Sequence, residues 1–231
     1  MWAITHLLDP LAIAVVFGGT ICAVLLSASF DDCKRALSAL RPWAKATPRA
    51  DAEQAARAVR QIQQILDQRG RVAAERVRTP LEFVHRAAVR LSECRTIDEF
   101  AEVERDEIAE RAARHAAVIA VWRFAADSAP AMGMIGTVVG LTIMFGQASS
   151  ADAMAPALSA AMLTTLYGLV ISAILAGPVA ARLEQISIAE CRWQQRAVDQ
   201  LTEMARRDEA SVAQPVRMAG WRPDRARSHA A

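Results

Sequence analysis

The run from residue 128 to 151, SAPAMGMIGTVVGLTIMFGQASSA, contains no charged residue and is rich in glycine and other small residues. A helix that crosses the hydrocarbon core of a bilayer needs about 20 consecutive apolar residues. Glycine destabilises a helix by about 1 kcal/mol relative to alanine, so glycines are expected there when another backbone approaches closely. The run therefore predicts a membrane-spanning helix that packs tightly against other helices.

Two further blocks, residues 10–30 and 153–181, also lack Asp, Glu, Lys and Arg, and each is long enough to cross a bilayer. The first block could alternatively be a cleaved signal peptide. Residues 1–9 contain no Lys or Arg, however, and the apolar run is longer than the apolar region of a typical signal peptide. We therefore expect an all-α integral membrane protein with three transmembrane helices, whose long helices extend into the cytoplasm.

Basic residues are concentrated on one side of the predicted spans. The segment between the second and third spans carries only Asp152, whereas the other flanks carry Lys34, Arg35, Arg41, Lys45, Arg111, Arg114, Arg123, Arg182 and Arg192. Basic flanks stay on the cytoplasmic side. The expected layout is a periplasmic N-terminus (1–9), span one (10–30), a cytoplasmic helical region (31–127), span two (128–151), a short periplasmic loop (152–156), span three (157–181), and a cytoplasmic helix with a tail (182–231).

The predicted cytoplasmic region has clear helix signals. Thr79 and Glu82, like Thr96 and Glu99, have the spacing of a capping box, which predicts one helix from residue 79 to about 93 and another from 96. No strong helix breaker follows until Pro130, so the second helix is expected to continue into span two. An apolar stripe after Pro48 predicts an earlier helix, and it consists of Ala55, Val59, Ile62 and Leu66. From about residue 206 the composition predicts disorder.

The three spans lack the groups that normally carry protons or bind ions in membranes, because none contains Asp, Glu, His, Lys or Arg. They do contain hydroxyls, and a membrane Thr most often bonds to its own helix or to a neighbouring one. Thr137 lies between two glycines and Thr165 lies three residues before another, where helices can approach and form a narrow polar seam. The glycines expected to allow this packing are Gly133, Gly136, Gly140 and Gly168. If the chain conducts ions, another polypeptide must supply the titrating carboxylate.

Residues 129–141 (APAMGMIGTVVGL) and 163–168 (LTTLYG), with the charged run 104–115 before them, resemble the MotA/TolQ/ExbB family of ion-channel subunits, and most closely its MotA branch. The resemblance implies a homopentamer in the bacterial inner membrane, whose second and third spans line a passage around two copies of a MotB-, TolR- or ExbD-like partner. That partner has one span and an essential Asp. The resemblance also implies that Thr137 and Thr165 lie on the ion path, and that Pro130 and Pro178 couple ion passage to conformational change.

Two features depart from the MotA pattern. Flagellar MotA chains have four spans, whereas three spans with an outside N-terminus are typical of TolQ and ExbB. In the MotA segment that faces the flagellar rotor, an Arg precedes a Gly by three residues and a Glu follows it by five. Gly70 and Glu75 fit this pattern, but Asp67 occupies the Arg position, and the nearby basic residues are Arg69 and Arg71. Glu75, Arg69 and Arg71 are therefore candidate contacts with a cytoplasmic target.

We accordingly predict a pore-forming subunit of a motor or energiser complex driven by an ion gradient, with protons as the favoured ion. Two alternatives remain open: a flagellar stator subunit that generates torque, and a non-conducting membrane scaffold. An enzyme has the least support, since the sequence has no visible nucleophile–base pair, phosphate loop or metal-binding cluster. No cofactor, metal or nucleic acid is expected, and membrane lipids and further copies of the chain are the other expected partners.

Overall fold

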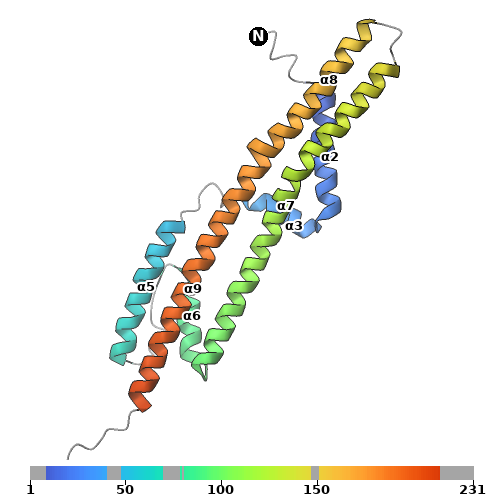
Figure 1. The fold of residues 1–231 in the computed structure, drawn as a ribbon. Coiled ribbons are helices and arrows are strands. Elements are labelled where there is room, and N and C mark those ends of the chain that lie inside the picture. The colour runs from blue at the N-terminus through green and yellow to red at the C-terminus, as the bar shows by residue number, and fades with distance from the viewer. Residues whose placement is uncertain (1–8, 41–47, 70–78, 80, 147–150, 214–231) are drawn as a thin grey trace, which may run out of the picture. The chain divides into compact units, whose positions relative to one another are not determined.

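The computed structural model describes residues 9–40, 48–69, 79, 81–146 and 151–213. These ranges contain helices and no strands: α2 (Pro10–Ser27), α3 (Phe30–Ser38), α5 (Pro48–Arg69), α6 (Glu82–Glu93), α7 (Ile97–Gly146), α8 (Ala151–Val170), the π-helix η2 (Ile171–Ala176) and α9 (Gly177–Ala213) (Figure 1). Three helical stretches are long and apolar enough to cross a membrane, and they belong to α2, α7 and the continuous run from α8 into α9. The predicted all-α membrane fold with three spans is confirmed.

The chain forms two compact units. The first, called here the membrane unit, comprises Met1–Ala50 and Glu107–Arg192. The second, called the extramembrane unit, comprises Asp51–Asp106 and Trp193–Ala231. Both long helices, α7 and α9, contribute to each unit.

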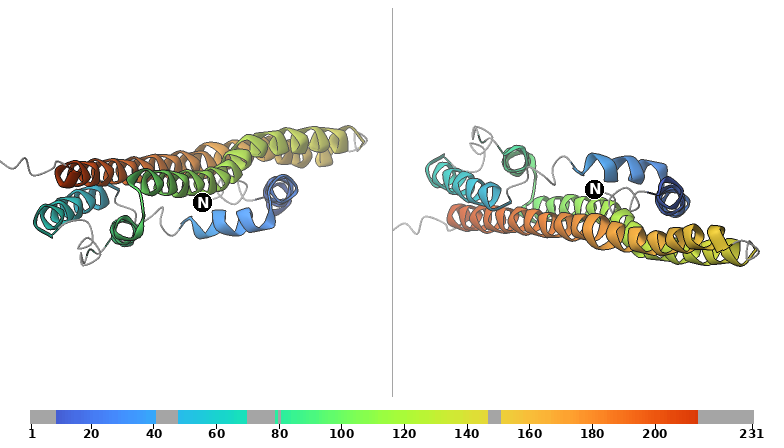
Figure 2. Two further views of the ribbon diagram at one scale, coloured as in Figure 1. Left: turned by 90° about the horizontal axis from the view of Figure 1, so that it is seen from below. Right: turned by 90° about the horizontal axis from the view of Figure 1, so that it is seen from above.

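In the membrane unit, α7 and the α8–α9 run lie side by side, and α2 packs beside them (Figures 1 and 2). The Asp9 side chain caps α2, because its Oδ1 accepts hydrogen bonds from the N–H groups of Leu11 (2.9 Å) and Ala12 (3.4 Å). The helix ends at Ser27, three residues before the predicted end of the span. After it, α3 is tied to α7 by the Trp122 indole, which donates a 3.1 Å hydrogen bond to the carbonyl of Ala36.

The start of α7 is as predicted. The Thr96 hydroxyl precedes the helix and accepts a 3.2 Å hydrogen bond from the N–H of Glu99. From there α7 continues through Pro130 to Gly146, which confirms that one helix runs from the charged segment into span two.

The third span differs from the prediction in two ways. Residues 152–156, predicted as a loop, belong to α8, whose alanine-rich start favours helix. Before Pro178 the helix also widens into the π-segment η2, in which the Gly177 N–H reaches back to the carbonyl of Ser172. Pro178 has no N–H and its ring would clash with a carbonyl one α-turn earlier, so a wider turn at this point lets the helix continue.

The extramembrane unit has an apolar core. Its buried side chains come from all four helical segments, and they include Ala55, Val59, Ile62, Phe83, Val84, Leu91, Phe100, Val198 and Leu201. Phe83 and Trp193 pack edge to face with ring centroids 5.7 Å apart. Three residues of the predicted stripe, Ala55, Val59 and Ile62, are buried as expected, while the side chain of Leu66 lies outside the described part of the chain.

Two helix boundaries in this unit correct the sequence analysis. The capping box at Thr79 is wrong: α6 begins at Glu82, and the Thr79 hydroxyl instead accepts a 3.3 Å hydrogen bond from the N–H of Leu81, which is a turn contact. At the other end, α9 continues to Ala213 rather than ending near residue 206, and its last turns contain good helix formers and an ion pair between Arg207 and Glu203.

Candidate functional site

The two candidate ion-path hydroxyls lie in direct contact. The Oγ1 atoms of Thr137 on α7 and Thr165 on α8 are 2.5 Å apart. Thr137 Oγ1 also lies within hydrogen-bond distance of the carbonyls of Gly133 on its own helix (3.0 Å) and Ala161 on α8 (3.2 Å). Both Thr side chains are half-buried. The contact therefore forms a polar point between two helices that are otherwise uncharged along this stretch.

Glycines bring the two helices this close. A Cβ on Gly168 would lie 2.6 Å from the carbonyl oxygen of Ala129, and one on Gly133 would lie 2.8 Å from that of Thr164. A Cβ on Gly136 would meet the Thr164 side chain at 2.7 Å, and one on Gly140 would meet the Ala161 Cβ at 2.8 Å. Contacts this short mean that a side chain at any of these four positions would require neighbouring atoms to move. All four predicted packing glycines thus lie on the face where α7 and α8 meet.

Thr164, next to Thr165, has a different environment. Its side chain is buried, and its hydroxyl lies 2.7 Å from the Ala161 carbonyl and 3.2 Å from the Gly133 carbonyl. It closes the seam between the helices, whereas Thr137 and Thr165 keep partial exposure within the single chain. All three hydroxyls therefore make contacts between α7 and α8, and Thr164 is the buried one.

The structure places the two candidate coupling prolines differently. Pro130 lies at the close approach of α7 to α8, since a Cβ on Gly168 would be 3.2 Å from its Cα. Pro178 follows the π-segment, thirteen residues after Thr165, which is about 20 Å along a helix. The structure therefore places Pro130 at the packed α7–α8 contact, seven residues before Thr137, and places Pro178 beyond the π-segment.

The candidate cytoplasmic contacts are Glu75, Arg69 and Arg71. Glu75 and Arg71 lie outside the described residues, and Arg69 is the last residue of α5 with its side chain outside them. Their role stays a prediction.

Charged and polar side chains join α7 to α9 further along the membrane unit. Arg111 pairs with Glu107 and Glu190, each at 3.5 Å, and a ring nitrogen of His115 lies 3.0 Å from the Ser187 hydroxyl. Burial, and then the charge of Glu190, raise the pKa of the Cys191 thiol, although Ser187 and Arg111 partly oppose the effect. The thiol therefore stays protonated at neutral pH, which disfavours a nucleophilic role.

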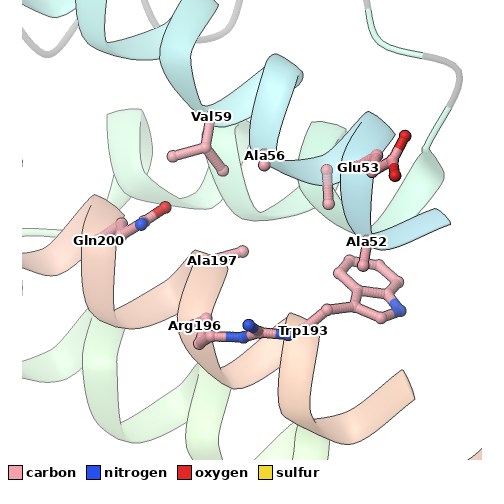
Figure 3. A pocket seen from close by; sticks show the side chains of 9 residues that line it. Ala52, Glu53, Ala56, Val59, Trp193, Arg196, Ala197 and Gln200 are labelled. Carbon is pink, nitrogen blue, oxygen red and sulfur yellow. The ribbon is translucent and has the colours of Figure 1, made fainter. Parts of the chain in front are cut away.

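A cavity of about 300 Å³ lies in the extramembrane unit between α5 and α9 (Figure 3). Alanine methyl groups and Val59 form much of its lining, with the Trp193 ring, Glu53, Arg196 and Gln200. Glu53 also pairs with Arg57 at 3.6 Å. This lining is that of a groove between amphipathic helices, and we assign no ligand to it.

Two features of the membrane unit were not found from the sequence. One is the π-segment, whose only signal was Pro178. The other is the contact of Tyr167, a residue of the 163–168 motif to which the sequence assigns no role: its hydroxyl accepts a 3.3 Å hydrogen bond from the N–H of Asp9. Nothing in the spacing of residues 158 positions apart indicates such a contact.

The fold and this site define a multi-span helical membrane protein with a hydroxyl pair between two closely packed, uncharged helices. Residues 50–194 match the model of the MotA/TolQ/ExbB proton channel family, and the chain belongs to that family.

Individual relatives agree with this assignment. The chain is 35% identical over 106 residues to Motility protein A of Cereibacter sphaeroides, covering 46% of this chain and 42% of that protein. It is 46% identical over 70 residues to chemotaxis protein PomA of Vibrio alginolyticus, covering 30% and 28%. The matches thus span less than half the length of these curated relatives. In fold it is similar to the flagellar MotAB stator complex of Bacillus subtilis, with a TM-score of 0.76, 20% identity, and coverage of 91% of this chain and 86% of that one.

Proposed function

We propose that this chain is a pore-forming subunit of a proton-driven complex in the bacterial inner membrane. The observation that carries the proposal is the contact between the Thr137 and Thr165 hydroxyls in a helix pair that has no charged residue at that depth. Hydroxyls can coordinate or pass an ion, but they do not titrate near neutral pH. The conducting unit is therefore this chain together with a second protein that supplies a membrane carboxylate.

We infer the arrangement of the complex from the family resemblance and from the charges that flank the spans. Several copies of the chain, five by the family resemblance, surround a partner with a single span and a membrane Asp. The N-terminus is periplasmic, and the basic flanks of the spans are cytoplasmic. Passage of protons past the Asp drives movement between the two subunits, and Pro130 and Pro178 transmit that movement into the cytoplasmic helices.

The proposal is tested with the complex purified from its own membranes and reconstituted in liposomes. Proton uptake is followed with an internal pH dye after a potassium diffusion potential is applied. Thr165→Val should lower the flux at least about tenfold, because a hydrogen bond to a charged group contributes about 1.5–3 kcal/mol. The matched control is Thr142→Val, since that exposed hydroxyl donates a 2.8 Å hydrogen bond to the Val138 carbonyl of its own helix.

Two results would contradict the proposal. Unchanged flux in an intact Thr165→Val complex would remove Thr165 from the path. Full flux from the purified chain without a partner would remove the need for a second protein. Comparing the flux in sodium-containing and sodium-free buffer distinguishes the two candidate ions.

Torque on a flagellar rotor is a second candidate function. It is favoured by the likeness to a structure described as a flagellar stator complex and by the match to motility proteins. Deletion of the gene should then abolish swimming while flagella are still assembled. A swimming deletion strain would direct attention to other targets. Function that survives collapse of the proton gradient would favour the non-conducting scaffold instead.

A further inference from the structure

The hydroxyl of Tyr167 links two helices of the membrane unit that are far apart in sequence. It accepts a 3.3 Å hydrogen bond from the N–H of Asp9, the residue that caps α2. The Tyr167 ring packs against a buried cluster formed by Val16, Ala129 and Ile171. Ring and hydroxyl together therefore fix one side of α8 against α2 and α7.

Thr165 lies on nearly the opposite side of the same helix. Each residue of an α-helix turns the chain by about 100°, so residues 165 and 167 project about 200° apart. Thr165 meets Thr137 of α7 on one side, while Tyr167 meets Asp9 on the other. A rotation of α8 that carries the Thr165 hydroxyl away from Thr137 must also pull the Tyr167 hydroxyl away from α2.

The helix that follows α8 has a different rotational register. The π-segment Ile171–Ala176 begins four residues after Tyr167, and its wider turns change the rotational register of everything that follows. An unbroken α-helical register therefore does not run from α9 into α8. The glycine contacts and the Thr164 hydroxyl fix the face of α8 that meets α7, and the Tyr167 hydroxyl adds a contact near α2 on another side of α8.

We propose that Tyr167 is a positioning residue for the ion path, whose hydroxyl holds α8 in the rotation that presents Thr165 to Thr137. The inference rests on the proposed function for its effect on protons, but its geometric part is independent of conduction. It assigns Tyr167 no contact with the ion itself.

The geometric part is tested by cross-linking. Thr137→Cys and Thr165→Cys are combined in a chain whose four native cysteines are replaced by alanine, and the rate of oxidative disulfide formation is measured in membranes. Adding Tyr167→Phe, which keeps the ring and removes the hydroxyl, should slow the reaction about threefold to tenfold, the factor that corresponds to the net contribution of one hydrogen bond. The matched control is Thr20→Val, which removes a buried hydroxyl of α2 that bonds to Val16 of its own helix at 2.7 Å.

The functional part uses the purified complex with native Thr137 and Thr165. Tyr167→Phe should lower proton flux in liposomes by a similar factor while the complex elutes unchanged from size-exclusion chromatography, and Thr20→Val should leave flux unchanged. Unchanged cross-linking in Tyr167→Phe would overturn the positioning role, whatever the flux. Slower cross-linking with unchanged flux would show that this rotation does not govern conduction, which also overturns it. If the native complex conducts no protons, the proposed function fails, and the cross-linking still decides the geometric part.

Discussion

The two units of this protein hold their helices together by different means. In the membrane unit, α7 and α8 meet at four glycines. A Cβ added at any of these glycines would lie only 2.6–2.8 Å from an atom of the facing helix. In the extramembrane unit, large side chains such as Phe83, Leu91 and Phe100 interlock in a buried core. The difference reflects the solvent: water drives large apolar side chains together, whereas lipid does not, so membrane helices associate through close packing and hydrogen bonds.

The largest expected effect comes from filling the glycine contact. In Gly168→Val the new side chain would clash with the backbone of Ala129 and Pro130, which cannot move aside as a flexible side chain can. Overpacking of this kind destabilises by about 1–3 kcal/mol or more, so we expect the assembled complex to be lost. Size-exclusion chromatography of detergent-solubilised membranes measures how much of the complex remains assembled. Gly18→Val is the control, because nothing lies within 4 Å of the Cβ position there.

A comparable test in the extramembrane unit removes an ion pair. Arg90 on α6 contacts Glu104 on α7 at 2.6 Å, and the Glu104 side chain is only 1% exposed. Arg90→Ala leaves a buried carboxylate without this partner and should destabilise the unit by about 3 kcal/mol. The free energy of unfolding is measured by chemical denaturation monitored with circular dichroism. Arg57→Ala breaks the exposed pair with Glu53 and should change stability by less than about 1 kcal/mol. Equal effects of the two variants would mean that burial of Glu104 is not what matters.

A smaller effect is expected from removing the Thr164 hydroxyl, which packs α8 against α7, than from removing the hydroxyl of Thr165, which we propose to lie on the ion path. Thr164→Val removes the buried hydroxyl that bonds to the Gly133 and Ala161 carbonyls, while valine keeps the shape. We expect about 1 kcal/mol lower stability and proton flux within about twofold of the native complex. Thermal unfolding and liposome flux are measured on the same preparation. Flux reduced as strongly as in Thr165→Val would erase the distinction between the two neighbouring residues.

The parts of this structure that could be predicted are those that a single local property determines. Lack of charge over about twenty residues is enough to define a span, because the bilayer excludes charge at any position along it. The continuity of α7 followed from the Thr96 cap and the lack of a breaker before Pro130. The contact of α7 with α8 was expected from glycine spacing, although its partner atoms were not.

The parts that could not be predicted depend on a choice between nearly equal hydrogen bonds or on distant residues. The spacing of Thr79 and Glu82 predicted a capping box, but the Thr79 hydroxyl accepts its hydrogen bond from the N–H of Leu81. Pro178 could have kinked or ended the helix, and the π-segment is a third solution that the residue alone does not indicate. The contact of Tyr167 with Asp9 joins residues whose proximity only the packing of α2 creates.

The smallest effect concerns the polar contacts between α7 and α9. These contacts involve neither close-packed glycines nor large apolar side chains. The negative charge of Glu190 is one of the causes that raise the pKa of the Cys191 thiol, because it disfavours the thiolate. Glu190→Gln removes that charge and leaves Arg111, so the pKa should fall and the thiolate fraction at pH 8 should rise. Alkylation of Cys191 by a maleimide, in a chain whose other cysteines are replaced by alanine, should then become several-fold faster. Glu184→Gln, six residues earlier on α9, serves as the control. A pH–rate profile that Glu190→Gln leaves unshifted would mean that burial alone protects this thiol.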